Sequence, residues 1–155
     1  MMKYISMCIL LGIFLSACNS GSGNNNSNTA HDAPKTHADS LLKEVMDGHD
    51  FAMAKMSKLS AAQKRVQQVI DSINKLPQTQ QKSIAVYKTS LDSLAEKLKY
   101  ADFSMNKWME EFEYDSATKS SNRELYLESE NKKIANVKGA ITTALRQADS
   151  LLKKE

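Results

Sequence analysis

The stretch IAVYKTSLDSLAEKLKYADFSMNKWMEEF, residues 84–112, places apolar side chains at alternating intervals of three and four residues. A helix with this spacing carries its apolar side chains on one face, as helices do in bundles and coiled coils. We therefore predict a helix over about residues 78–112, with the apolar stripe facing a helical core. The stripe consists of Ile84, Tyr87, Leu91, Leu94, Leu98, Ala101, Met105, Trp108 and Phe112.

The same spacing recurs on both sides of this stretch, and it predicts two further helices over about residues 38–75 and 122–154. The earlier stripe is Leu42, Val45, His49, Ala52, Met56, Leu59, Gln63, Val66, Ile70 and Ile73. The later stripe is Leu127, Glu130, Ile134, Val137, Ile141, Ala144, Ala148 and Leu151. Short connections make neighbouring helices antiparallel. The expected fold is all-α, an antiparallel, coiled-coil-like three-helix bundle over residues 36–155. The alternative is a helical hairpin that dimerises, so the chain is expected to be a monomer or a helical dimer.

Local signals mark the ends of the three helices. Thr36 and Asp39 have the spacing of a capping box before the first helix, and Ser121 and Glu124 repeat it before the third. Pro77 ends the first helix, because proline lacks the backbone donor and clashes with the preceding turn. The polar residues 114–120 are expected to connect the second helix to the third.

The N-terminus predicts export and lipidation. A start with one positive charge, Lys3, precedes an apolar run over residues 5–15, which is too short to span a bilayer. The run ends in Leu15-Ser16-Ala17-Cys18, an aliphatic residue, two small residues and a cysteine. This pattern is typical of a bacterial lipoprotein signal, so we predict a signal peptide over residues 1–17 and diacylglycerol on Cys18. An ordinary signal that ends in cysteine and an uncleaved anchor are the alternatives.

Residues 18–35 contain a Gly/Ser/Asn tract without core-forming side chains, and we expect a disordered linker that holds the folded part away from the lipid. Position 19 is Asn. The common cue for retention in the inner membrane is Asp at this position, so that cue is absent. The expected location is the cell envelope, with the lipid in the outer membrane and the chain facing the periplasm. The expected partners are this membrane and an envelope protein.

Composition excludes several classes of function. The formal charge is only +3 and acidic and basic residues are interspersed, so nucleic-acid binding has no support. Cys8 leaves with the signal and Cys18 carries lipid, so no thiol remains for a disulfide or a thiolate metal site. No phosphate loop, catalytic triad or two-histidine zinc motif is visible in the sequence. We expect a non-enzymatic protein without a cofactor other than the covalent lipid.

Two polar residues, His49 and Glu130, interrupt the apolar stripes. Pairing the helices across their two connections places His49 opposite Trp108, and Trp108 beside Glu130. Met53, Met105 and Met109 fall within about a turn of this layer, and Met53 and Met109 are expected to widen the apolar stripes. The candidate site therefore consists of His49, Met53, Met105, Trp108, Met109 and Glu130.

The layer can be a surface for a small ligand or a partner, and it has three further interpretations. A buried histidine bonded to a glutamate fixes the register of a bundle, and methionine fills gaps in cores. Thioether and imidazole groups also suit Cu(I) or Ag(I), and an indole face attracts cations. The third interpretation is an enzyme that uses His49 with Glu130 or Asp50 as an acid–base pair. A buried stripe gives substrate little access, which argues against this interpretation. Gln63 is a second polar stripe position, expected opposite Leu94.

Three blocks also carry a resemblance: VMDGHDFAMAKM at 45–56, ADFSMNKWMEEF at 101–112, and LESENKKIANV at 127–137. Together they resemble a family of small uncharacterised lipoproteins of Bacteroidetes, over most of residues 40–150. Some members carry the label "viral A-type inclusion protein", which reflects coiled-coil similarity. The resemblance implies a helical architecture and a Gram-negative envelope, and it carries over no active site.

Overall fold

The computed structural model describes residues 36–153, and within them it contains helices and no strand, which confirms the all-α class. The predicted signal peptide, the lipidated Cys18 and the linker lie outside the described residues. The helices are α1 (His37–Asn74), α2 (Gln78–Ser83), α3 (Ala85–Glu111), α4 (Tyr114–Thr118) and α5 (Arg123–Leu152).

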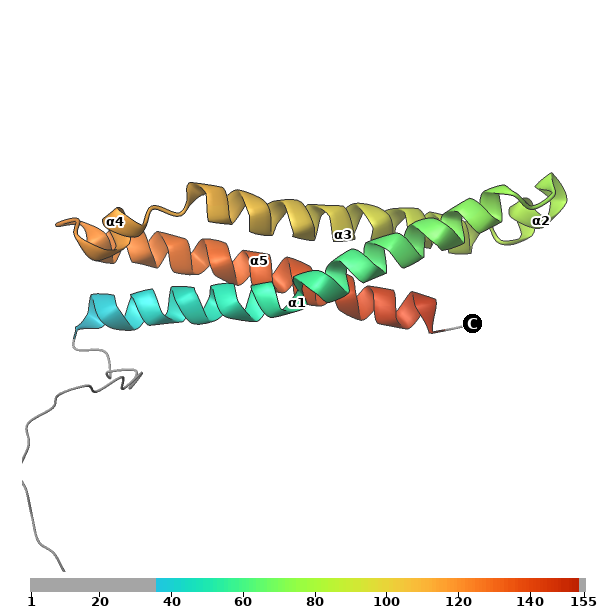
Figure 1. The fold of residues 1–155 in the computed structure, drawn as a ribbon. Coiled ribbons are helices and arrows are strands. Elements are labelled where there is room, and N and C mark those ends of the chain that lie inside the picture. The colour runs from blue at the N-terminus through green and yellow to red at the C-terminus, as the bar shows by residue number, and fades with distance from the viewer. Residues whose placement is uncertain (1–35, 154–155) are drawn as a thin grey trace, which may run out of the picture. The chain divides into compact units, whose positions relative to one another are not determined.

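The three long helices α1, α3 and α5 lie side by side, and each contacts the other two (Figure 1). The colours of Figure 1 show that α1 and α5 run in one direction and α3 in the opposite one. The chain reverses at α2 and again at α4, and α4 packs on α5 beside the beginning of α1. Over residues 36–153, no helix combines the length and the apolar character needed to cross a membrane.

The core between the long helices consists of the predicted stripes. Every stripe residue is buried or half-buried, and the largest fully buried apolar side chains are Leu59, Leu91, Leu94, Leu98, Met105, Leu127, Ile134 and Ile141. The prediction that Met53 and Met109 widen the stripes is wrong, because these side chains are 42% and 38% exposed. Ala52 and Met105, both fully buried, already fill the core next to them.

The beginning of α1 is fixed as the sequence predicts. The Thr36 hydroxyl accepts from the backbone N–H of Asp39, and the Asp39 carboxylate accepts from the N–H of Thr36, both at 3.1 Å. Arg123, the first residue of α5, binds the same carboxylate at 2.9 Å. The hydrogen bond from Thr36, followed by that from Arg123, lowers the pKa of Asp39 below 3.8.

Two local predictions are wrong. The helix expected over 78–112 is interrupted at Ile84, where φ is −113° and ψ is 18°, because the Gln81 amide donates to the carbonyls of Asn74 and Leu76 and holds α2 against the end of α1. Residues 114–120 connect α3 to α5 as predicted, and they contain a short helix, α4, that the sequence pattern did not indicate. The second capping box does not form: Asn122 rather than Ser121 precedes α5, with φ of −102° and ψ of 21°, and its side chain makes no capping bond.

At Gly48 the side chain of Ile134 of α5 packs closely on α1, and this contact was not predicted from the sequence. It is buried in α1, and a Cβ at this position would lie 3.0 Å from both γ carbons of Ile134. Real Cβ atoms seldom come so close to another carbon, so any larger residue at this position would require the Ile134 side chain to move.

Candidate functional site

Four aromatic rings in contact with one another cross the molecule in the predicted layer. The structure brings His49 of α1 against Trp108 of α3, with ring centroids 5.7 Å apart. Trp108 contacts Phe112 at 5.0 Å, and Phe112 contacts Tyr126 of α5 at 6.1 Å. The planes tilt by 32° to 42°, so the rings are neither stacked nor perpendicular. The contacts connect α1 to α5 through the end of α3.

The His49 imidazole is held by its neighbour in the chain. Its Nδ1 lies 2.9 Å from the Asp50 carboxylate, and its side chain is 25% exposed. The register interpretation expected a bond between His49 and Glu130, and within residues 36–153 this bond is not formed. His49 therefore lies at the edge of the core, with one ring nitrogen engaged and one face against Trp108.

Glu130 is the buried charged residue of the layer, and its partner is Lys133 on the same helix. The Lys133 ammonium donates to Oε1 at 2.7 Å, and this hydrogen bond raises the pKa of Lys133 above 10.5. Glu130 Oε2 and Trp108 Nε1 are also buried, and neither has a hydrogen-bond partner among residues 36–153. A buried polar atom without a hydrogen bond lowers the stability of the folded state, so these two atoms are a cost to the layer.

Tyr126 closes this side of the layer. Its hydroxyl accepts from the backbone N–H of Glu113 at 2.7 Å, just before α4 begins. Burial raises the pKa of Tyr126 above its ordinary value of 10.0, and the nearby Glu130 carboxylate acts in the same direction. The phenol therefore remains neutral at physiological pH and anchors the connection between α3 and α5.

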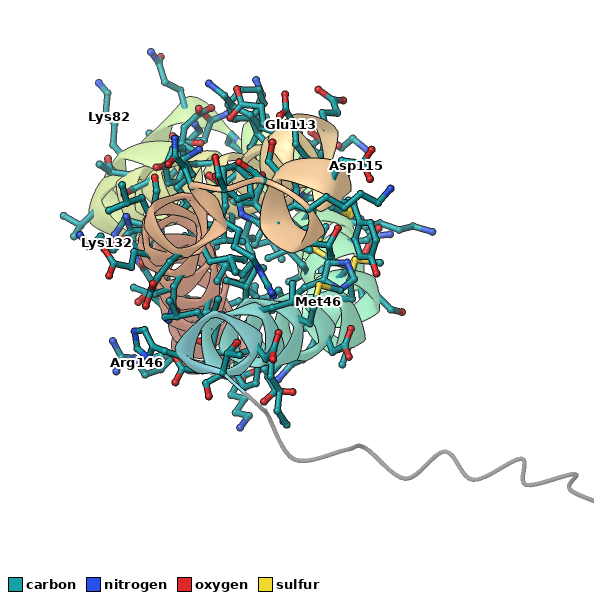
Figure 2. All side chains as sticks on the ribbon, turned by 90° about the vertical axis from the view of Figure 1, so that its left-hand side faces the viewer. Met46, Lys82, Glu113, Asp115, Lys132 and Arg146 are labelled. Carbon is teal, nitrogen blue, oxygen red and sulfur yellow. The ribbon has the colours of Figure 1, made fainter. Side chains whose placement is uncertain are left out.

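The methionines lie on one side of the molecule, as Figure 2 shows by the sulfur atoms around Met46. Met105 is fully buried, Met46 and Met56 are half-buried, and Met53 and Met109 are exposed. Thioethers therefore line the contact of α1 and α3 from the core to the surface. Over the described range, no three His, Cys, Asp or Glu side chains group around a possible metal position.

Three parts of this arrangement were not predicted from the sequence. The bond from Lys133 to Glu130 follows helical spacing, i to i+3, and that spacing is the signal that could have revealed it. The pairing of the helices expected Phe112 near Leu127, and the contact of its ring with that of the adjacent Tyr126 was not singled out. Gln63 forms its polar contact with the backbone carbonyl of Leu98, at 3.2 Å, rather than with a side chain of another helix.

Comparisons with protein-family models, with curated proteins and with solved structures found no match to this chain. The function of the site must therefore be inferred from the chemistry of its own residues.

Proposed function

We propose that this chain is a lipid-anchored protein of the bacterial envelope, held by diacylglycerol on Cys18, whose helices form a non-enzymatic module that binds or scaffolds other envelope components. We also propose that the helices form an antiparallel, coiled-coil-like three-helix bundle. Lys3, the apolar run and Leu15-Ser16-Ala17-Cys18 support export and lipidation. Two or three acyl chains hold a protein firmly, whereas one holds it only marginally.

The distribution of exposed apolar side chains is the observation that carries the binding role. The large exposed hydrophobic residues of the described part are Phe51, Met53, Val86, Tyr100, Phe103, Met109, Tyr114 and Leu125. All except Val86 lie between the middle of the long helices and the end at which α1 begins. The first described residue, Thr36, lies at this same end, so the half of the helices that includes the start of the described chain carries most of the exposed apolar side chains that a partner could contact.

The test is photo-crosslinking in cells, with a photoreactive amino acid at Met109 and, as the matched control, at Val86. The proposal expects a discrete adduct with an envelope component at Met109, none at Val86, and loss of the adduct when Cys18→Ala releases the protein from the membrane. Equal labelling at both positions, or labelling that persists without the anchor, would refute a partner surface that acts at the membrane.

Soft-metal binding is the second candidate, supported by the thioethers beside His49. Met46, His49, Met53 and Met56 follow each other at intervals of three, four and three residues, which places them on one face of α1. Thioether sulfur and imidazole nitrogen are ligands that Cu(I) and Ag(I) accept. The mature chain would be titrated with Ag(I), while the fluorescence of Trp108 and the NMR shifts of His49 are followed. Binding must be lost in His49→Ala and Met105→Leu, and a titration without stoichiometric binding excludes this candidate.

A further inference from the structure

A groove of about 320 Å³ lies between α3 and α5, and Trp108 lines it while His49 does not. Two aromatic side chains of α3, Tyr100 and Phe103, line it, and they are 64% and 58% exposed. They are three residues apart and so lie on one helix face. Aromatic side chains this exposed are unusual on a surface that contacts only water, and they offer two ring faces to a ligand.

The charges along this groove cancel in pairs. Lys107 lies 3.6 Å from Glu111, and Lys133 lies 2.7 Å from Glu130. The polar lining therefore offers hydrogen bonds without a net charge, and this disfavours phosphate, nucleic acid and strongly charged peptides. The ligand that complements such a groove is neutral and carries many hydrogen-bonding groups.

Two buried atoms, one on the groove residue Trp108 and one on the partner of the groove residue Lys133, lack hydrogen-bond partners of opposite kinds. Trp108 Nε1 is a donor and Glu130 Oε2 is an acceptor, and neither is hydrogen-bonded within the described chain. A hydroxyl group both accepts and donates, so it supplies what each atom lacks. Trp108 and Lys133 line the groove, and the Lys133 side chain is 49% exposed. Movement of this flexible side chain would open the layer to a ligand hydroxyl.

We propose that the groove between α3 and α5 binds a neutral oligosaccharide. The C–H faces of sugar rings would pack on Tyr100 and Phe103, and hydroxyl groups would bond to Asn136, Lys133 and the atoms behind it. Glycan strands are a principal polyhydroxylated material of a bacterial envelope. This choice of ligand therefore rests on the proposed envelope function, whereas the groove itself does not.

The lone tryptophan of the chain provides the readout, because Trp108 lines the groove and no other indole contributes to the fluorescence. The lipidated mature protein, kept in a zwitterionic detergent without a sugar headgroup, is titrated with chitotetraose, cellotetraose and maltotetraose. At least one of them is expected to change the Trp108 emission saturably. The variant Tyr100→Ala/Phe103→Ala should weaken this binding by about tenfold or more, because two ring contacts are lost.

Val86→Ala, at an exposed apolar position far from the groove, is the matched control and should leave the affinity unchanged. Both variant sites are exposed, so circular dichroism and the melting temperature should be those of the parent. A flat titration with all three sugars overturns the proposal, and so does unchanged affinity in the double variant. A response to an uncharged amphipathic peptide, but to no sugar, also overturns it and identifies a peptide groove. Membrane release by Cys18→Ala is measured separately, so failure of the anchor and failure of sugar binding are distinguishable.

Discussion

Substituting Gly48 by alanine tests the close approach of α1 and α5. Alanine in the interior of a helix is favoured over glycine by about 1 kcal/mol. At Gly48 the new methyl group would lie 3.0 Å from Cγ1 and Cγ2 of Ile134. Ile134 is almost fully buried, and no single rotation moves both of its γ carbons away. Overpacking of this kind costs about 1–3 kcal/mol, so Gly48→Ala should lower the free energy of unfolding by about 0–2 kcal/mol.

Gly139 provides the matched control, because it lies within α5 and a Cβ there would meet nothing within 4 Å. Gly139→Ala should therefore raise the free energy of unfolding by about 0.5–1 kcal/mol. Urea unfolding followed by circular dichroism measures both values, and equal slopes of the two transitions show that stability alone has changed.

Ile134→Ala completes a double-mutant cycle, because alanine has no γ carbons to meet the new methyl group. In that background Gly48→Ala should stabilise the protein by about 1 kcal/mol, and the coupling energy should be about 1–3 kcal/mol. If Gly48→Ala stabilises the parent as much as Gly139→Ala does, the two helices are not in contact at this point and the reasoning fails.

Three further predictions concern the core and its charges. Glu130→Met should leave the free energy of unfolding, measured by chemical denaturation, unchanged or raise it by about 1–2 kcal/mol. The substitution removes a buried carboxylate with an unpartnered oxygen, and half-exposed Lys133 remains free to reach water. A loss above about 3 kcal/mol would contradict this. Acid should weaken the beginning of α1, because Asp39 has a lowered pKa in the folded state. The stability that the Asp39 carboxylate contributes is present above pH 3.8 and is lost as the pH falls through the folded-state pKa. Melting temperatures of the parent and of Asp39→Asn should therefore converge on acidification, and a constant difference would exclude this role. Met105→Ala should lower the free energy of unfolding by about 2–5 kcal/mol and Met53→Ala by under about 0.5 kcal/mol, because Met105 is buried and Met53 is exposed. Similar losses in urea unfolding would contradict this difference in burial.

The helical class and the core were predictable because both depend on a repeated pattern. An apolar stripe at intervals of three and four residues determines which face of a helix is buried, whatever the partner helix is. The break at Ile84 was not predictable from that pattern, since Ile84 continues the stripe while its backbone leaves the helix. The break depends on the amide of Gln81, whose bonds to Asn74 and Leu76 form only once the chain has turned.

The candidate site was predictable in position but not in chemistry. Register placed His49 against Trp108, because two helices joined by a short connection have fixed pairing. The hydrogen-bond partners depend instead on side-chain direction: Asp50 and Lys133, on the residues' own helices, bond to Nδ1 of His49 and to Oε1 of Glu130. Gly48 was overlooked because a buried glycine leaves no apolar signal in a stripe.

The central claim, that the chain is tethered by lipid on Cys18, is tested most directly by the intact mass of the mature protein purified from its membranes. We expect a chain that begins at Cys18, with the added mass of a diacylglycerol on its thiol and no residue of 1–17 remaining. A chain that retains residues 1–17, or one that begins elsewhere and carries no lipid mass, would contradict the lipid anchor.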